Sequence, residues 1–225
     1  MAEKIQAQVP GRKKATEIEV VIRTPLSGNG TEPKTRVEGM VEGRPISLIE
    51  RRSPTNEAFK TNWEKFRKAG LPVIPTLRVD GERGHLLVTD LKRDGSELYG
   101  KNLKFILLNE GRVKTSHRRH SDVDKHFLEL SAPESFELIK KKAEECARQA
   151  TEHRLSLPMD DPLELLIHPD GRWELIILDL TWAADRSASP LTERQLQGAN
   201  DLLVGKFVES LREIRRMLLE KSSAQ

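Results

Sequence analysis

The order of its hydrophobic patterns constrains this chain more than any other feature of the sequence. Alternating segments rich in β-branched residues, typical of strands, dominate before residue 92. Long segments with apolar residues at helical spacing dominate after residue 100. The segment between them, KRDGSELYG at 92–100, is polar and rich in turn-forming residues. Because strands and helices are segregated rather than alternating, the sequence predicts an α+β protein in two parts.

The first part contains strand patterns on both sides of one helix. The strand patterns cover residues 16–24, 35–52, 71–79 and 84–91. The second of them turns at Glu42-Gly43, a pair typical of a tight hairpin. The predicted helix runs over about 53–70, where Ser53 can cap the start and Gly70 can end the helix. Its apolar face carries aromatic residues at helical spacing, namely Phe59, Trp63 and Phe66.

Two strong helices are predicted in the second part. The first covers 132 to about 153 and is preceded by Ser131, which with Glu134 predicts a capping box. The second begins at Thr192, which with Gln195 predicts another capping box. Residues 101–111 are apolar without a clear periodicity. Residues 112–126 predict a charged loop or an exposed strand edge.

An acidic hairpin separates these two helices. The stretch DPLELLIHPDGRWELIILDL, residues 161–180, predicts two apolar strands around a Pro-Asp-Gly turn. Asp160 and Asp161 precede the first strand, and Asp179 stands at the end of the second. A plain hairpin does not require carboxylates at its ends, whereas Mg²⁺ bound to phosphates requires oxygen ligands of this kind. The alternative is that these carboxylates only close turns.

Composition narrows the functional classes. The single cysteine, Cys146, excludes an internal disulfide and a cysteine-based zinc cluster. No apolar run is long enough to cross a membrane, and the N-terminus lacks a secretory signal, so we expect a cytoplasmic protein without membrane association. The formal net charge is +3 and aromatic residues make up 4%. This balance permits nucleic-acid binding but does not favour it.

The order of elements, together with these carboxylates, resembles the protein-kinase-like fold. GLPVIPTLRV and GHLLVTDL resemble the strands that lead to the hinge of small kinase-like proteins. LELLIHPDGRWELIILDL resembles the family's catalytic hairpin, which delivers a metal-binding Asp. The resemblance implies a two-lobed fold with a flexible basic tail at 1–16, an N-lobe at 17–95 and a reduced helical C-lobe at 96–225 that carries a catalytic-type hairpin. The N-lobe would hold an antiparallel sheet and one helix.

The resemblance also implies roles for particular residues, with ATP and Mg²⁺ as cofactors. Asp161 or Asp160 would be the base that positions a substrate hydroxyl. The metal would be held by Asp179 and Glu164. The nucleotide would contact the hinge and the cation-carboxylate pair of the N-lobe, which the resemblance places at Asp90, Leu91, Arg51 and Glu64.

Several departures from the family pattern affect this function. There is no G-x-G-x-x-G loop, no lysine lies between Lys34 and Lys60, and His153-Arg154 is followed by Leu155 rather than an acid. We therefore expect a kinase-like protein with impaired catalysis that acts as a regulatory or scaffolding module for a protein partner. One alternative is an active, divergent ATP- and Mg²⁺-dependent phosphotransferase. Another is a basic module that binds nucleic acid or protein through its tail and residues 112–120, without nucleotide.

Overall fold

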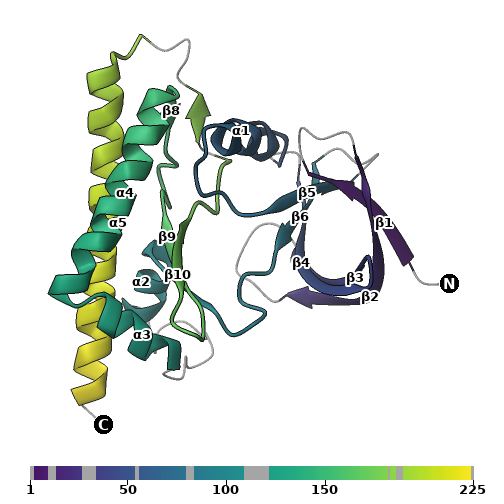
Figure 1. Ribbon diagram of the computed structural model, residues 1–225, viewed down its shortest axis with the longest axis horizontal. Helices are drawn as coiled ribbons and strands as arrows, with labels where there is room; N and C mark the ends of the chain where they lie inside the picture. Colours follow the sequence, from purple (N-terminus) through teal and green to yellow (C-terminus); the bar gives the residue numbers. More distant parts are fainter. Residues whose placement is uncertain are drawn as a thin grey trace.

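The computed structural model describes residues 3–9, 14–26, 34–53, 56–79, 84–108, 122–181, 183–185 and 190–223. The strands are β1 (Glu3–Gln8), β2 (Thr16–Leu26), β3 (Lys34–Val41), β4 (Arg44–Arg52), β5 (Thr76–Val79), β6 (His85–Thr89), β7 (Glu97–Tyr99), β8 (Leu155–Ser156), β9 (Glu164–Ile167), β10 (Trp173–Ile176) and β11 (Ala184–Asp185). The helices are α1 (Asn56–Lys68), α2 (Lys101–Leu108), α3 (Asp122–Leu130), α4 (Pro133–Glu152) and α5 (Glu193–Ser223). Figure 1 shows the first six strands at one end of the molecule and α4 and α5 at the other, with the β9–β10 hairpin between them.

The six N-terminal strands form a closed antiparallel barrel. Their order around the barrel is β1-β2-β3-β4-β6-β5, and β1 closes the ring by pairing with both β2 and β5. Because side chains alternate along a strand, every second residue points inward. The interior is filled by Ile5, Ala7, Ile18, Val20, Val37, Leu48, Val79 and Leu87.

The predicted two-lobed kinase-like architecture, with an N-lobe made of an antiparallel sheet and one helix, is therefore wrong. The sheet is closed, and the strand that closes it lies in the segment predicted to be a flexible basic tail. Ile5 and Ala7 are buried, whereas Lys4 and Gln6 are polar and exposed. A short strand such as β1, with one polar face, has little local sequence signal. In addition, Ala7 of β1 pairs with Val79, which is more than seventy positions away in the sequence. The boundaries proposed for the two lobes stay a prediction.

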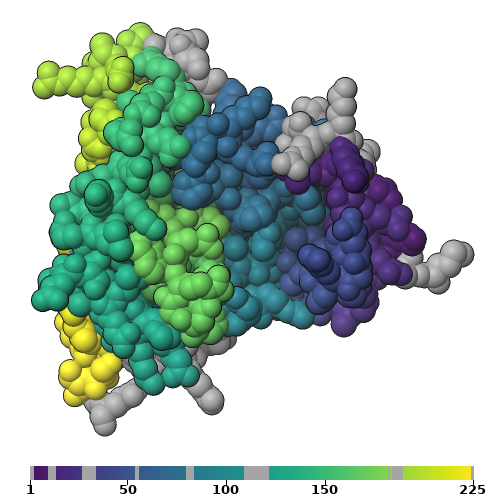
Figure 2. Space-filling view, in the orientation of Figure 1, coloured from purple at the N-terminus to yellow at the C-terminus, as the bar shows by residue number. Residues whose placement is uncertain are grey.

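Helix α1 connects the barrel to the rest of the molecule. Its aromatic residues Phe59, Trp63 and Phe66 belong to the same continuous core as the buried residues of α4 and α5. The indole of Trp63 donates a hydrogen bond to the carbonyl of Ile74 at 2.6 Å. The side-chain amide of Asn62 donates to the carbonyl of Leu180 at 2.7 Å, in the segment that follows β10. In the space-filling view, the blue segment around α1 lies between the purple barrel strands and the green hairpin (Figure 2).

The hairpin β9–β10 is extended by β7 into a three-stranded sheet of order β10-β9-β7. Strand β9 is buried along its whole length, because the helical part covers it. No helix among the described residues is both long and apolar enough to cross a membrane.

Two local predictions about turns and caps are confirmed. The β3–β4 hairpin turns at Glu42 and Gly43, which have φ values of 50° and 75°. This pair of positive angles matches the turn that suits the twist of a hairpin. At the start of α5, the backbone N–H of Gln195 donates to the Thr192 hydroxyl at 3.2 Å, and the backbone N–H of Thr192 donates to the Gln195 side chain at 2.8 Å.

Two other local predictions are wrong. Helix α4 begins at Pro133 with Ala132 as its N-cap, and no side chain caps it, so the Ser131–Glu134 capping box does not form. Helix α3 occupies the end of the charged stretch that was predicted to be a loop or strand edge. Its Asp124 is buried and accepts a hydrogen bond from Tyr99 at 2.7 Å, which a loop assignment did not anticipate.

The close approach of β2 and β3 generates a first prediction. A Cβ at Gly39 would lie 2.5 Å from the carbonyl oxygen of Glu19, so Gly39→Ala should lower the free energy of unfolding by about 1–3 kcal/mol through overpacking. Gly205→Ala is the control, because a Cβ there meets nothing within 4 Å and should stabilise α5 by about 1 kcal/mol. Chemical denaturation of both variants measures these changes. Equal stability of the two variants would show that β2 and β3 can separate at little cost.

Candidate ligand-binding cleft

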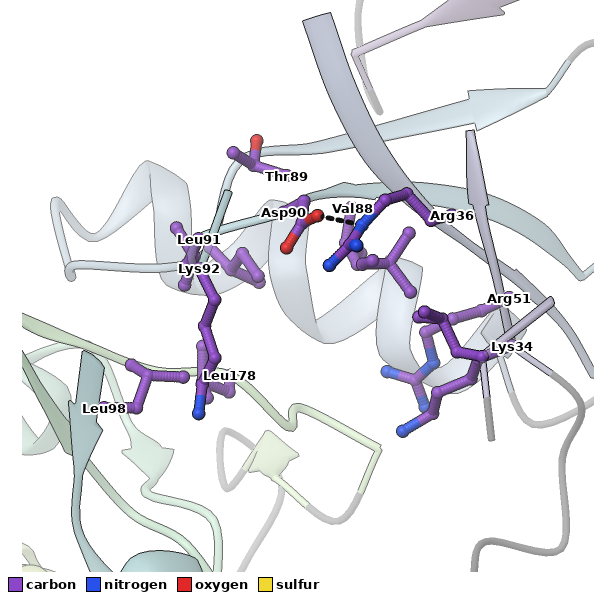
Figure 3. A pocket seen from close by; sticks show the side chains of 13 residues that line it. Lys34, Arg36, Arg51, Val88, Thr89, Asp90, Leu91, Lys92, Leu98 and Leu178 are labelled. Carbon is purple, nitrogen blue, oxygen red and sulfur yellow. Dashed lines mark hydrogen bonds and ion pairs between the residues drawn. The ribbon is translucent and has the colours of Figure 1, made fainter. Parts of the chain in front are cut away.

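A cleft of about 370 Å³ lies between the barrel and the hairpin side of the molecule. Figure 3 shows its lining residues, with barrel residues on one side and Leu98 and Leu178 on the other. The apolar part of the lining consists of Leu26, Ile49, Ile74, Val88, Leu91, Leu98 and Leu178. The charged part consists of Lys34, Arg36, Arg51, Lys92 and Asp90. The cleft thus combines apolar walls with four cations and one carboxylate.

The barrel places its cleft residues through strand alternation. The interior residues Val37 and Leu48 point into the barrel, so their neighbours in β3 and β4 point outward toward the cleft. In the β3–β4 register, Lys34 is opposite Arg51 and Arg36 is opposite Ile49. Strands β3 and β4 therefore present two residue pairs on the same face. One pair consists of two cations, and the other consists of a cation and an apolar residue.

Asp90 fixes the segment that follows β6. Its carboxylate accepts a hydrogen bond from Nε of Arg36 at 2.6 Å and another from the hydroxyl of Ser47 at 3.1 Å. Its backbone N–H donates to the carbonyl of Ser47 at 3.1 Å. Asp90 is buried, and these contacts tie the chain after β6 to β3 and β4. The adjacent Leu91 then lines the cleft.

The structure brings some of the predicted nucleotide-contacting residues together. Arg51, Asp90 and Leu91 all line the cleft. The guanidinium of Arg51 also lies over the ring of Phe59, 5.4 Å from its centroid, which fixes its direction against α1. Glu64 lies on α1 and is not among the residues that line this cleft.

Asp179 lies next to the cleft, but its carboxylate is hydrogen-bonded to the backbone of Thr181. Strand β10 ends at Ile176, three residues earlier than the strand end predicted from the sequence. Leu178, which directly precedes Asp179, lines the cleft. The Asp179 carboxylate accepts a hydrogen bond from the backbone N–H of Thr181 at 2.9 Å, the geometry of a turn closed by an aspartate. This hydrogen bond is the one expected if the Asp179 carboxylate only closes a turn.

Asp160 and Asp161 precede β9 and have different surroundings. Asp160 is exposed and forms an ion pair with Lys101 at 3.3 Å. One oxygen of Asp161 accepts a hydrogen bond from the side-chain amide of Asn102 at 3.1 Å, whereas its other oxygen is buried without a hydrogen-bond partner. Burial raises the pKa of Asp161 above its ordinary value, and the carboxylates of Asp160 and Asp179 add to that shift. Asp161 is therefore the less solvated of the two candidate bases.

Glu164 is the most unusual carboxyl group in the structure. Its residue is 2% exposed, and neither carboxyl oxygen has a hydrogen-bond partner. The group packs directly against Gly100, where any side chain would collide with it. Burial, followed by the negative charge of Asp161, raises its pKa from 4.5 to about 8. Glu164 is thus neutral at pH 7 in the folded protein.

These carboxyl groups do not fit a dedicated metal centre. Among the described residues, no group of three or more histidine, cysteine, aspartate or glutamate side chains is placed to share a metal ion. Asp179 is already hydrogen-bonded by Thr181, and Glu164 is sealed inside the protein as a neutral acid. The metal-binding roles of Asp179 and Glu164 therefore stay predictions, and we derive no step through Mg²⁺.

The sequence analysis missed three cations of the cleft, namely Lys34, Arg36 and Lys92. The alternation of Lys34 and Arg36 along one strand was the available signal, because residues two apart share a face. The predicted strand pattern begins at residue 35, which leaves Lys34 outside the strand. The basic stretch 112–120 and residues 10–13 of the predicted basic tail lie outside the described residues.

No protein-family profile and no curated protein sequence matches the chain. A rhoptry kinase from Toxoplasma gondii is a structural neighbour with a TM-score of 0.44 and 10% sequence identity, covering 85% of this chain and 54% of the kinase. This chain thus spans about half the length of that protein. Similarity this distant establishes neither a fold family nor an activity for this chain.

The buried acid generates a second prediction. Folded Glu164 keeps its proton up to about pH 8, whereas the unfolded chain loses it near pH 4.5. The unfolded state therefore binds fewer protons across this window, and the free energy of unfolding falls as pH rises from about 4.5 to 8. Glu164→Gln, which cannot ionise, should flatten this slope and be more stable than wild type at pH 8, by an amount on the order of a few kcal/mol.

The measurement is urea denaturation at pH 5 and pH 8. Glu209→Gln is the matched control, because Glu209 is exposed on α5. That variant should keep the wild-type difference between the two pH values. An unchanged slope in Glu164→Gln would show that the folded protein carries Glu164 as a solvated carboxylate.

Proposed function

We propose that the cleft binds a nucleotide and that the protein acts as a regulatory binding module in which phosphoryl transfer is impaired. The observation that carries this proposal is the composition of the cleft, in which apolar walls face each other beside a set of cations. A nucleotide has the same two parts, a flat base and charged phosphates.

The apolar walls suit a flat ring. Ile49 and Val88 belong to the barrel strands β4 and β6. Leu98 and Leu178 lie on the opposite side of the cleft from Val88 (Figure 3). A cleft volume of about 370 Å³ is of the size that small-molecule sites use. Burial of a base between these side chains would supply the hydrophobic part of the binding free energy.

The charged part of the cleft suits an anion. Four cations line it against a single carboxylate, and that carboxylate is already paired with Arg36. Cations outnumber carboxylates in the lining, which favours a ligand that carries phosphates, because Lys and Arg form charge-assisted hydrogen bonds with phosphate oxygens.

The state of the carboxyl groups supports the proposal that phosphoryl transfer is impaired. Phosphoryl transfer depends on metal ions that bridge the phosphates and on a group that positions the nucleophile. Glu164 is neutral and buried, and Asp179 closes a turn. The unpartnered oxygen of Asp161 keeps an active phosphotransferase as the second candidate, because a buried carboxylate with a raised pKa can serve as a base.

A variant that fills the cleft provides the third prediction. Ile49→Trp places an indole between the apolar walls, so the thermal stabilisation that ATP gives to wild type should disappear. Ile22→Trp is the matched control, because Ile22 is 50% exposed on another barrel strand and does not line the cleft. Differential scanning fluorimetry with ATP, ADP and adenosine, with and without Mg²⁺, measures the effect.

Two results would contradict the proposal. If wild type shows no shift with any of these ligands, the cleft does not bind nucleotides. If purified protein transfers phosphate from ATP and Asp161→Asn abolishes the transfer without weakening ATP binding, the protein is an active phosphotransferase.

A further inference from the structure

We propose that the two cavities beside residues 71–75 form a docking groove for an extended segment of a partner protein. An acidic side chain of that segment binds at α1, and a basic side chain binds at the β9–β10 hairpin. The inference goes beyond the nucleotide cleft and rests only on the proposed role of the protein as a binding module. It names the surface that the partner contacts and the chemistry that the partner carries.

The docking groove consists of two neighbouring cavities. The first has a volume of about 480 Å³ and is lined by residues of α1 and β5. The second has a volume of about 340 Å³ and is lined by the segment after β6 and by the β9–β10 hairpin. Both are lined by Pro72, Val73, Pro75 and Thr89. A chain that occupies both cavities therefore passes over residues 72–75.

The floor of the docking groove, residues 72–75, is held by backbone hydrogen bonds. Pro72 and Pro75 have a fixed φ and no N–H to offer to a ligand. The carbonyl of Pro72 accepts a hydrogen bond from the backbone N–H of Ile177 at 2.7 Å. The backbone N–H of Ile74 donates to the carbonyl of Ile177 at 3.1 Å, and the backbone N–H of Thr89 donates to the carbonyl of Pro75 at 3.0 Å. A partner would thus meet a preorganised surface, which lowers the entropy cost of binding.

Apolar side chains form most of the walls. Trp63, Leu71 and Leu77 line the first cavity. Leu166 and Leu175 line the second. Two apolar recesses along one path suit the side chains of an extended chain, in which every second residue points to the same side. Burial of these side chains would supply the hydrophobic part of the binding free energy.

The α1 end of the docking groove is basic. The guanidinium of Arg67 lies over the ring of Trp63, 5.5 Å from its centroid, and both residues line the first cavity. Arg67 is exposed, as is Lys68 in the same last turn of α1. A guanidinium held in this way can bind a carboxylate through two parallel hydrogen bonds. This end therefore favours an aspartate or glutamate of the partner.

The hairpin end of the docking groove is acidic. Asp94 and Glu174 line the second cavity, and their side chains are 58% and 59% exposed. His168 lies between them, with Nδ1 3.5 Å from Asp94 and Nε2 3.3 Å from Glu174. The neighbouring cation Arg172 forms its own ion pair with Asp170 at 2.6 Å. The two exposed carboxylates favour a lysine or arginine of the partner.

Opposite charges at the two ends determine the direction in which a segment binds. Complementary charges contribute specificity more than affinity, because a wrong orientation places like charges together. The partner segment thus carries an acidic residue, then apolar residues, then a basic residue, in the order in which it passes from α1 to the hairpin.

Selection from a random peptide library displayed on phage tests the docking groove. Wild type should enrich peptides in which apolar residues separate an acidic from a basic residue. By fluorescence anisotropy, the synthetic enriched peptide should bind Arg67→Glu and Glu174→Lys about tenfold more weakly than wild type, because each reversal places like charges together. Replacing the acidic residue of the peptide by lysine should restore affinity for Arg67→Glu but not for Glu174→Lys.

Lys206→Glu is the matched control, because it reverses an exposed cation on α5 and should bind the peptide as wild type does. The free energy of unfolding of each variant separates a loss of binding from a loss of folding. A library that yields no enriched peptide, or peptides whose affinity both groove variants leave unchanged, overturns the docking groove.

Two further results separate this proposal from its neighbours. Self-association of wild type that Arg67→Glu weakens would assign the groove to a second copy of this chain and overturn the partner segment. Peptide binding in a protein that ATP does not stabilise would support the docking groove and overturn only the nucleotide cleft.

Discussion

The pairing of β1 with both β2 and β5 is the constraint on which the rest of the structure depends. With every strand paired on two sides, the barrel has no free edge and its strand registers are fixed. A fixed register determines which side chains of β3 and β4 point inward to Val37 and Leu48 and which point outward. The outward set, Lys34, Arg36 and Arg51, forms the charged side of the cleft.

The position of the cleft depends on a second connection, made by α1. Its aromatic face belongs to the core of the helical part, while Asn62 holds the segment after β10 by hydrogen bonds to Leu180 and Ala183. The parallel bridge between Val73 and Ile177 adds a backbone contact at the same place. These contacts bring Leu178 opposite the barrel wall. These contacts hold the hairpin side opposite the barrel strands, and the cleft with its two apolar walls lies between them.

Charge is distributed unevenly between the two sides of this arrangement. The barrel side carries cations, whereas Asp161, Glu164 and Asp179 lie on the hairpin side. Burial, and to a lesser extent neighbouring carboxylates, raises the pKa values of Asp161 and Glu164, and no group of three or more metal-ligating side chains occurs among the described residues. The cations of the cleft lining are the physical basis of the proposed nucleotide binding.

Local sequence determined much of the secondary structure of this protein. The Glu42-Gly43 turn, the aromatic face of α1 and the Thr192–Gln195 cap depend on residues a few positions apart, and such interactions can be recognised without a fold. Barrel closure by β1, the Lys34–Arg51 pair and the sealing of Glu164 against Gly100 were decided only by the tertiary structure. Each of these joins residues that are distant in sequence, and the free energy of such contacts depends on burial and register that no local pattern encodes.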